Sequence, residues 1–436
     1  MTPEASIQKP ETDLPVAYLT THYPRVALTF VAGEIDGVEQ CGLTVHPIAM
    51  NRPSASDLLT QSDRARHAQT LYLKDSPARI ATALLSQSLR HPIRMMRLVA
   101  TAIKAADLDL KQAVRHLVHL AYAARVAAYC DAAGIRHLHA VFATAPGTIA
   151  WFAAAIMNFD PRRRAGWSFT VHGPHDFFDQ SKVRIDLKAA SARFIACISD
   201  FSRSQVYRII DPADWPKVEV VRCGIDLAAL PRRAARASSS PARIVTLGRI
   251  APEKGHLILL QAIGLLADRG IAAELDIVGA GPFEAAVRAE AERLGLTGHT
   301  HFTGELLPAA VAEALGQADI FCMASFAEGL PISIMEAMAL GVPVVCTAIS
   351  GIPELAIDGE TALTVPPGNA VALADALDML ISDPQLGERL THAARSAVEA
   401  MHDRSANAAG LAKLFRRSAG GIAVAHPADV SVAALG

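Results

Sequence analysis

Short apolar runs that read as strands alternate with helical stretches along most of this 436-residue chain, in two successive sets. This alternation is typical of a parallel, doubly wound sheet, because parallel strands need a crossover connection that is usually a helix. The two sets are separated at 227–242, a segment rich in Ala, Ser and Arg that is typical of a linker. The sequence therefore predicts an α/β protein with two doubly wound domains that face each other across a cleft.

The loops that follow the predicted strands are the places where a site is expected. In open α/β sheets, ligands bind outside the carboxyl ends of the strands, where these loops gather. The predicted strands are 15–20, 137–142, 167–172, 194–199 and 218–221 in the first set, and 243–248, 274–279, 299–304, 319–323, 343–347 and 363–365 in the second.

A helical region at about 58–130 interrupts the first set. Residues 61–120 carry ten Lys and Arg against four Asp. A basic amphipathic surface can lie on an anionic membrane, and it can equally be a solvated face over a core, so both interpretations stay open. No apolar run approaches the ~20 residues of a membrane span. We therefore expect any membrane contact to be peripheral.

The charge and the cysteine content limit the kinds of partner that the protein can bind and the cellular compartment in which it is expected. The net charge of −2 argues against nucleic acid as a main partner, although residues 1–230 hold 26 Lys and Arg against 21 Asp and Glu. Six cysteines are scattered without a C-x-x-C pair, and the first fifteen residues lack the pattern of a signal peptide. We expect reduced thiols and a cytoplasmic location, with peripheral contact at the inner face of the membrane as an open alternative.

The stretch 326–343 reads F-A-E-G-L-P-I-S-I-M-E-A-M-A-L-G-V-P. It predicts a helix over 332–340, with Pro331 suited to the first helical position. Glu336 is the only charged residue of that helix, and burying it unpaired would cost several kcal/mol, so it needs a dedicated partner. Glu328 lies in the loop at the positive end of the helix. A helix N-terminus beside two carboxylates suits a ligand with a phosphate and hydroxyl groups.

A second cluster of candidates follows the first strand of the second set. Within G-R-I-A-P-E-K-G, Arg249 and Lys254 can reach the strand edge, and two cations there suit a diphosphate. A later loop, G-A-G-P, lacks the third glycine of a dinucleotide fingerprint and is weak evidence for NAD. Glycines that let a ligand approach the backbone are Gly248, Gly279 and Gly304, and Glu305 follows the last of them.

In the first set, S-F-T-V-H-G-P-H-D-F ends a predicted strand in a turn with two histidines. His172, at the carboxyl end of that strand, is expected to face the cleft. The loop at 21–30, after the first strand, is placed at the same edge of the sheet. The candidate acceptor-binding residues on this side are Tyr23, Thr29, His175 and Asp176.

These motifs together support a resemblance to a known family. The E-x7-E pair within E-G-L-P-I-S-I-M-E-A-M-A-L-G-V-P-V-V resembles the signature of retaining glycosyltransferases of family 4, which have the GT-B fold. The segments G-R-I-A-P-E-K-G, I-V-G-A-G-P, F-T-G-E and S-G-I-P-E-L-A-I-D-G-E-T-A-L match in the expected order. The first half is similar to the branch that makes bacterial exopolysaccharide and lipopolysaccharide, through Y-P-R-V-A-L-T-F, H-L-H-A-V-F-A-T-A-P and F-T-V-H-G-P-H-D-F-F.

Two places depart from the family pattern. Many members have a glycine-rich loop after the first strand, where this chain has 23–30, and V-V-R-C-G-I-D replaces the commoner P-N-G before its aspartate. The resemblance still implies two Rossmann-like domains with separate tasks. The expected parts are a tail at 1–14, an acceptor-binding domain at 15–226, a nucleotide-sugar-binding domain at 227–403, a helix at 404–417 that crosses back to the first domain, and a mobile tail at 418–436.

The resemblance also implies how the donor is held. Arg249 and Lys254 would bind its diphosphate and stabilise the leaving nucleotide, which is a route that needs neither a metal nor a cofactor. The backbone at Gly329 and Leu330, with the helix dipole, would hold the distal phosphate.

Three further side chains would act on the sugar and the ribose. Glu328 would contact the sugar hydroxyls, Glu336 would accept from the ribose hydroxyls, and His172 would lie beside the anomeric centre. Family members transfer with retention, through front-face attack and an oxocarbenium-like state. The candidate catalytic residues are therefore His172, Glu328, Arg249 and Lys254.

The sequence thus predicts an enzyme that transfers a sugar from a nucleotide-diphosphate sugar to a saccharide acceptor, lipid-linked, in bacterial surface polysaccharide biosynthesis. A sugar-nucleotide epimerase or a disaccharide synthase on the same fold is the alternative. A non-catalytic nucleotide-sugar-binding protein is a third hypothesis, against which the intact set of site residues argues.

Overall fold

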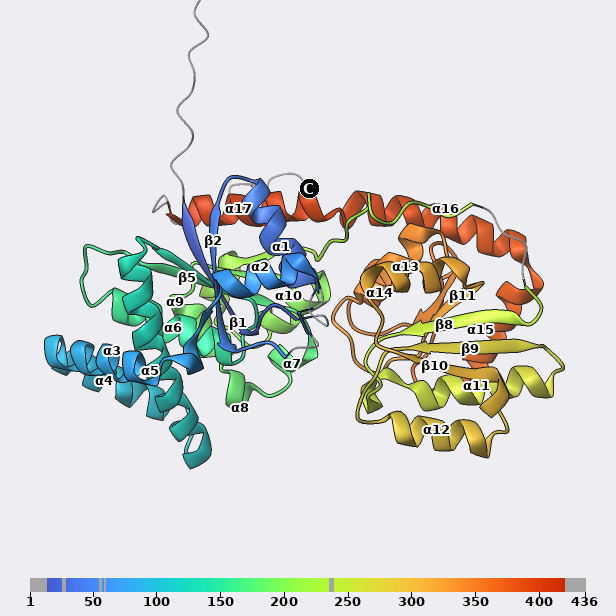
Figure 1. Cartoon of the computed structure of the whole chain (residues 1–436), viewed down its shortest axis with the longest axis horizontal. Helices are drawn as coiled ribbons and strands as arrows, with labels where there is room; N and C mark the ends of the chain where they lie inside the picture. Colours follow the sequence, from blue (N-terminus) through green and yellow to red (C-terminus); the bar gives the residue numbers. More distant parts are fainter. Residues whose placement is uncertain (1–13, 26–28, 55–56, 59, 235–238, 420–436) are drawn as a thin grey trace, which may run out of the picture.

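The computed structural model describes residues 14–25, 29–54, 57–58, 60–234 and 239–419, and within them the chain forms two parallel sheets flanked by helices (Figure 1). The predicted α/β class with two doubly wound sheets is confirmed. The tails expected at 1–14 and 418–436 lie outside the described residues, except for Leu14 and the last two residues of the final helix, Ser418 and Ala419.

The first sheet has the strand order β3-β2-β1-β4-β5-β6-β7 among the described residues. Its strands are β1 (Pro15–His22), β2 (Thr44–Asn51), β3 (Leu71–Tyr72), β4 (His137–Ala140), β5 (Gly166–Val171), β6 (Phe194–Cys197) and β7 (Val218–Val220). Its helices are α1 (Thr29–Gln40), α2 (Gln61–Gln69), α3 (Pro77–Arg90), α4 (Pro92–Lys104), α5 (Leu110–Ala132), α6 (Ala145–Met157), α7 (Pro174–Phe177), α8 (Gln180–Val183), α9 (Ile185–Ser191) and α10 (Asp200–Tyr207).

The second sheet has the order β10-β9-β8-β11-β12-β13 in the described chain. Its strands are β8 (Ala242–Leu247), β9 (Ala273–Val278), β10 (Thr300–Gly304), β11 (Ile320–Met323), β12 (Val344–Thr347) and β13 (Leu363–Val365). The helices that follow are α11 (His256–Asp268), α12 (Glu284–Arg293), α13 (Pro308–Gln317), α14 (Ile332–Leu340), α15 (Ala370–Ser382), α16 (Pro384–Met401) and α17 (Arg404–Ala419).

Two strands of the first sheet were not predicted. β2 contains Pro47, and proline argues against a central strand because it donates no ladder hydrogen bond. β3 pairs with β2 only at Ile48 and Ala49, which follow that proline. At Pro47 itself β2 therefore has no β3 neighbour and is the edge strand of the sheet. The helical region expected at 58–130 is also interrupted by β3, so the expectation of helix was wrong there.

The interiors of both sheets are apolar and closely covered. β4, β5, β6, β11 and β12 are buried at every position, as expected for central strands of a parallel sheet with helices on both faces. This burial fixes the strands as a rigid base. The loops at their carboxyl ends are therefore held in place by the core.

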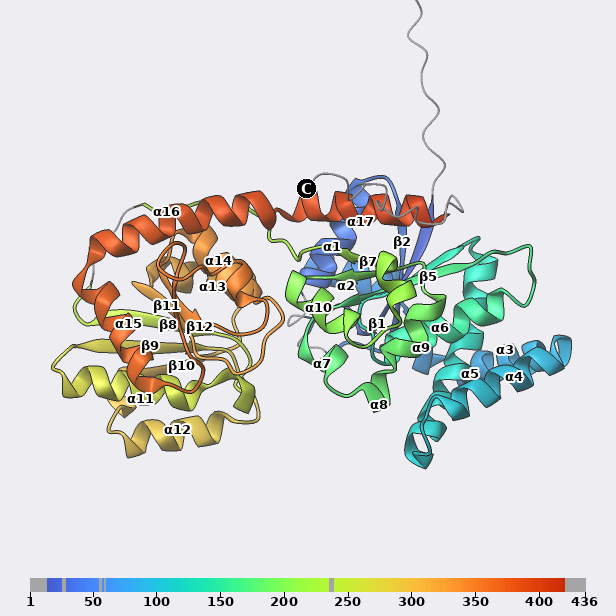
Figure 2. The same ribbon diagram turned by 180° about the vertical axis from the view of Figure 1, so that it is seen from behind.

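The last two helices run along both domains (Figures 1 and 2). α16 packs on α14 of the second sheet, and α17 packs on α1 of the first. At the passage between them, Ile225 and Asp403 form a parallel bridge, so the linker and the final helices cross side by side. Phe415 of α17 is fully buried, and its ring lies 5.9 Å from that of Tyr18 in β1. The C-terminal helix is thus part of the first domain's core.

Removal of the Phe415 ring tests this attachment. Phe415→Ala should lower the free energy of unfolding by about 3–5 kcal/mol. The substitution leaves a cavity among the packed rings of Tyr18, His139 and Phe194, and a cavity in a packed core is costly. Urea denaturation followed by circular dichroism measures the loss. Met379→Ala, at an exposed position of α15, is the control and should change stability by less than about 0.5 kcal/mol.

Candidate functional site

Three glycine loops lie against one another at the carboxyl edge of the second sheet. Gly279 donates its N–H to the carbonyl of Gly304 at 2.9 Å, and Gly248 donates to the carbonyl of Val278 at 3.0 Å. A Cβ added at Gly279 would lie 2.1 Å from the Gly248 carbonyl oxygen, so a side chain is excluded there. The three predicted glycines therefore do come together, and they form a surface of partly exposed backbone.

Lys254 lies over the same edge, on the loop between β8 and α11. The backbone of this loop is tied to the end of β11, because Phe326 donates its N–H to the carbonyl of Glu253 at 2.7 Å. The Lys254 ammonium donates to Glu328 Oε1 at 2.6 Å, and the Glu328 residue is only 9% exposed. Two of the predicted site residues are thus in direct contact, although they are 74 positions apart.

Arg249 projects into solvent from the beginning of the same loop. Its side chain is 58% exposed and donates to Glu253, a pairing that sequence reasoning missed. The spacing of four residues between an arginine and a glutamate is the signal that could have indicated it. An exposed ion pair of this kind is worth at most about 1 kcal/mol, so the guanidinium can exchange Glu253 for a phosphate.

α14 begins and ends where the sequence predicted, at Ile332 and Leu340. Pro331 is the N-cap residue rather than the first helical residue, because its ψ of 124° is extended. Its side chain offers no capping hydrogen bond, so the first N–H groups of the helix have no side-chain acceptor at the cap. Gly341, in the left-handed region at φ 77°, ends the helix. The free N-terminus beside Gly329 is suited to a phosphate.

Glu336 has no hydrogen-bond or ion-pair partner within the described part of the protein. Its carboxyl is partly buried, and burial raises its pKa to about 7. The dedicated partner that the sequence predicted is therefore not supplied by a described protein residue. A partly buried carboxylate that has no hydrogen-bond donor in the described protein is suited to bind a ligand that donates hydrogen bonds.

His172 lies between two aromatic rings of the first domain. The centroids of Phe30 and Phe142 are 4.9 Å and 5.0 Å from its imidazole, and its Nδ1 is 3.8 Å from the sulfur of Cys223. Burial lowers the pKa of His172 to about 3, so the ring is neutral at ordinary pH. Its Nε2 is buried and has no partner among the described residues. A neutral imidazole with one unused nitrogen can exchange a hydrogen bond with a ligand.

The turn that carries His172 touches the loop that carries Glu328. A Cβ added at Gly329 would lie 1.9 Å from the carbonyl oxygen of His172, and one added at Gly173 would lie 3.0 Å from Gly329 Cα. The opposite side of Gly329 is fixed as well, since Gly351 donates its N–H to the Gly329 carbonyl at 3.2 Å. The structure therefore brings candidate residues of both domains to one place.

A carboxylate of the second domain caps a helix of the first. Glu354 accepts from the N–H groups of Asp200 at 2.9 Å and Phe201 at 2.7 Å, the first two of α10, and Arg222 donates to Glu354 at 3.1 Å. Sequence reasoning gave these residues no role. Glu354 lies within the quoted S-G-I-P-E-L-A motif, which was the one available signal. This contact fastens the two domains beside the Gly329 contact.

The four candidate acceptor residues divide into two buried and two exposed side chains. Tyr23 is 1% exposed, and its hydroxyl accepts from Arg66 at 2.8 Å. Asp176 is 2% exposed and accepts from the N–H of His172 at 2.9 Å, and burial raises its pKa to about 6. Both therefore hold neighbouring backbone or side chains in position. Thr29 and His175 are exposed.

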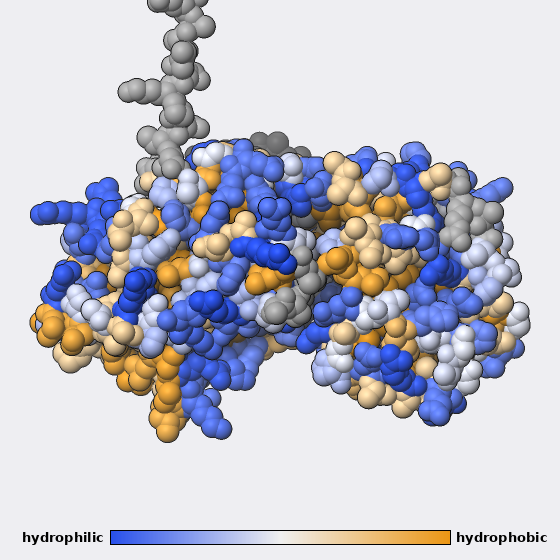
Figure 3. Space-filling model, in the orientation of Figure 1, coloured by the Kyte–Doolittle hydropathy of each residue, from blue (hydrophilic) through white to orange (hydrophobic). Residues whose placement is uncertain are grey.

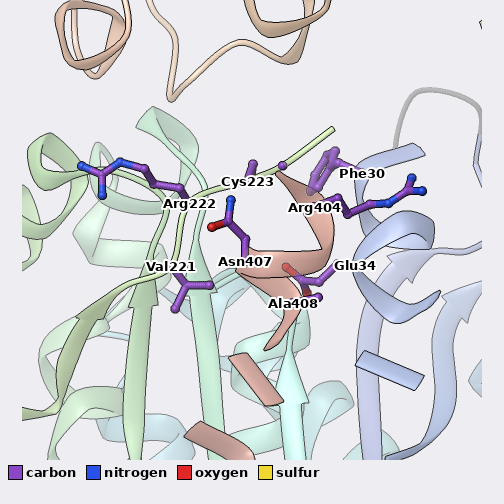
Figure 4. Close-up of a pocket in the computed structure, with 9 residues that line it drawn as sticks. Phe30, Glu34, Val221, Arg222, Cys223, Arg404, Asn407 and Ala408 are labelled. Carbon is purple, nitrogen blue, oxygen red and sulfur yellow. The ribbon is translucent and has the colours of Figure 1, made fainter. Parts of the chain in front are cut away.

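Two pockets lie at the first domain, and none of the four candidate acceptor residues lines either of them. The pocket in Figure 4 lies where the linker passes α17, between Phe30 and Cys223, and its volume of about 20 Å³ suits one water and excludes a sugar. An open pocket of about 410 Å³ lies at the outer edge of the first sheet, where β2 and β3 end. It is lined by Arg52, His67, Ala68, Thr70, Leu71, Tyr72, Asp75 and Ser76. In the described part of the chain, no cluster of His, Cys, Asp and Glu is arranged to hold a metal ion.

Comparison with known proteins agrees with the geometry of the second domain. Residues 231–397 match the family model described as glycosyl transferases group 1. The matched segment holds the second sheet. Over 186 residues the chain is 33% identical to the putative colanic acid biosynthesis glycosyltransferase WcaL of Escherichia coli, covering 41% of this chain and 45% of that protein. It is 31% identical over 209 residues to the amylovoran biosynthesis glycosyltransferase AmsK of Erwinia amylovora, with 47% and 51% covered. The chain thus spans about half the length of the curated relatives it matches.

Solved structures match over nearly the whole chain. Anabaena Alr3699/HepE in complex with UDP aligns with a TM-score of 0.69 at 17% identity, covering 92% of this chain and 99% of that one. The sucrose-phosphate synthase of Thermosynechococcus elongatus aligns with a TM-score of 0.70 at 19% identity, covering 94% and 100%. At such low identity these similarities concern the fold alone, and they confirm the predicted two-domain GT-B architecture.

The partly buried Glu336 predicts a pH dependence of stability in the ligand-free protein. Its pKa is about 7 in the folded protein against 4.5 ordinarily, so the penalty for ionising it is absent below pH 4.5 and complete above pH 7. Glu336→Gln should therefore raise the free energy of unfolding by about 1–3 kcal/mol near pH 8 and change it little near pH 4.5. Urea denaturation at both pH values measures this. Glu305→Gln, at an exposed position, is the control, and an equal gain at both pH values for Glu336→Gln would contradict the assignment.

The Gly329 contact predicts a second outcome. Gly329→Ala cannot keep the contact with the His172 carbonyl, so the domains should separate and the radius of gyration should rise in small-angle scattering. Gly298→Ala is the matched control, because an added Cβ there meets nothing within 4 Å. An unchanged scattering profile for Gly329→Ala would show that the contact does not hold the domains together.

Proposed function

We propose that this chain is a retaining glycosyltransferase that moves a sugar from a nucleotide-diphosphate sugar to a saccharide acceptor. The observation that carries the proposal is Glu336, a partly buried carboxylate without a described partner, on a helix whose N-terminus is uncapped. The ribose of a nucleotide offers two hydroxyl donors to the carboxylate, and its phosphates match the helix N-terminus.

The donor is held by groups that lie at the edge of the second sheet. Lys254 and Arg249 bind the diphosphate, and the N–H groups at Gly329 and Leu330 bind the distal phosphate; the Leu330 side chain is buried in the core, so only its backbone takes part. Gly248, Gly279 and Gly304 let the nucleotide approach the backbone, and exposed Glu305 lies beside the last of them.

The Lys254–Glu328 pair has two roles in this proposal. It fixes Glu328 Oε1, which leaves Oε2 to accept from a hydroxyl of the donor sugar. It also keeps the ammonium within reach of the phosphates. As the bond to the leaving nucleotide breaks, negative charge grows on the diphosphate, and Lys254 with Arg249 stabilises that charge.

His172 faces the sugar from the first domain. Because its imidazole is neutral, it donates or accepts a hydrogen bond at the anomeric centre without placing a positive charge beside an oxocarbenium-like state. Asp176 positions it through the backbone, and the aromatic rings of Phe30 and Phe142 hold its plane. The incoming hydroxyl attacks the anomeric carbon from the face that the nucleotide leaves and passes its proton to the departing diphosphate oxygen, which gives retention.

The acceptor binds at the first domain, with exposed Thr29 and His175 as contacts and Tyr23 as a positioning residue. WcaL and AmsK are named for colanic acid and amylovoran biosynthesis, which supports an acceptor in bacterial surface polysaccharide assembly. We infer a lipid-linked saccharide for this role. The structural neighbour HepE was solved with UDP and with UDP-glucose, which supports a nucleotide-diphosphate sugar as donor.

A thermal-shift screen of nucleotide-diphosphate sugars tests the proposal and selects the donor. One class of nucleotide should raise the melting temperature in a concentration-dependent way, because a ligand that binds only the folded state stabilises it. Incubation of that donor without acceptor should leave it unchanged. Turnover to a new sugar nucleotide would instead identify an epimerase.

Calorimetry on a variant then tests the key residue. Glu336→Ala should weaken binding of the selected donor by about 10- to 100-fold, because it removes an acceptor of two charge-assisted hydrogen bonds. Glu388→Ala, at an exposed position of α16, should leave the affinity unchanged and serves as the control. Equal affinities of Glu336→Ala and the unaltered protein would contradict the assignment.

A further inference from the structure

Helices α3, α4 and α5 expose large apolar side chains that nothing in the described protein covers. They recur at helical spacing, so each helix has a second apolar stripe besides the one packed on the core. Each is at least 38% exposed. They are Leu85 and Leu89 on α3, Ile93, Met96 and Ile103 on α4, Leu108 in the connection, and Leu110, Val114, Leu117 and Val118 on α5. Single exposed apolar residues are ordinary, but nine on three adjacent helices and a tenth in their connection indicate an interaction surface.

Cations accompany these residues. Residues 77–118 contain seven Lys and Arg against two Asp. Among the described residues, none of the seven cations forms an ion pair, and all seven are exposed: Arg79, Arg90, Arg94, Arg97, Lys104, Lys111 and Arg115. One of the two aspartates, Asp109, is used as the N-cap of α5. The surface therefore combines apolar side chains with positive charge that no described acidic side chain pairs with.

The shape of this region decides what can cover it. The three helices project from the body of the first domain in both views (Figures 1 and 2), and Figure 3 shows hydrophobic residues gathered over them along the lower edge. A projecting ridge is not a groove that a peptide or helix would fill. Apolar residues on a projection, with cations beside them, are the arrangement that enters a lipid surface.

We propose that the exposed face of α3, α4 and α5 binds an anionic lipid membrane, with its apolar side chains inserted at the boundary of headgroups and acyl chains. The cations lie at the level of the lipid phosphates. No helix within the described chain is long and apolar enough to cross a membrane, and the proposed contact is interfacial. Membrane binding itself does not depend on the proposed function. Only the purpose of the binding rests on it, which is to bring the site to a lipid-linked acceptor.

The pocket at the end of β2 and β3 fits this orientation. Its lining ends at Ser76, and α3 begins at the next residue, so the pocket borders the proposed membrane surface. The pocket offers Arg52, whose guanidinium lies 5.5 Å from the centroid of the Tyr72 ring. A charged and aromatic pocket suits the polar head of a lipid-linked saccharide.

Cosedimentation of the full chain with vesicles tests the proposal. The unaltered protein should bind vesicles that contain phosphatidylglycerol and bind vesicles of phosphatidylcholine alone more weakly. Leu89→Gln, Ile93→Gln and Met96→Gln combined should reduce partitioning at least about tenfold, because three inserted side chains are lost. Arg90→Glu, Arg94→Glu and Arg97→Glu combined should weaken binding to the anionic vesicles and abolish its salt dependence.

The matched control is Val371→Gln with Met379→Gln, which removes exposed apolar residues from α15 of the second domain and should leave partitioning unchanged. Circular dichroism confirms that each variant is folded, which the exposure of all these positions favours. Equal sedimentation of the apolar variant and the unaltered protein would overturn the proposal. So would a dimer in lipid-free solution that the apolar variant converts to a monomer. The readout uses no donor, so failure here leaves donor binding, and with it the proposed function, separately testable.

Discussion

The site depends on a backbone contact between two glycine-containing turns, one from each domain. Gly329 meets the carbonyl of His172 so closely that a single added carbon would separate them. Glu354 fastens the same interface by accepting from the first N–H groups of α10. The first contact joins backbone to backbone, and the second joins the Glu354 side chain to two backbone N–H groups, so backbone takes part in both and sets the distance between the domains. The residues proposed to act on the sugar, His172 and Glu328, each lie next to this contact.

Glu336 shows how a site can be destabilising by itself and still be well defined. Its carboxyl is partly buried on a helix whose other residues are mostly core, so the packing of α14 holds it in position. The raised pKa expresses the penalty for ionising it. A ligand that donates hydrogen bonds removes this penalty on binding, and part of the energy of donor binding would come from there.

Much of the fold and the donor side could be predicted from sequence because local signals agreed. The bounds of α14 follow from proline, glycine and a mostly apolar run, and the glycines at the carboxyl ends of β8, β9 and β10 follow from the predicted strand ends. The missed features depend on tertiary contact. Pro47 is tolerated only because β3 is so short, and Glu354 caps a helix 154 positions away in the chain. Burial of Tyr23 and Asp176 likewise depends on packing that no local pattern specifies.

The basic helical region illustrates the limit of composition. Counting charges at 61–120 left a membrane surface and a solvated face equally open, because both need cations outside. The exposure of the apolar side chains distinguishes the two interpretations. A solvated face over a core would have its apolar residues buried, but α4 buries Met95 and Leu98 and exposes Ile93 and Met96. A helix with apolar residues on two faces needs two apolar environments. The core of the first domain supplies one, the rest of the described chain does not supply the second, and a lipid surface would.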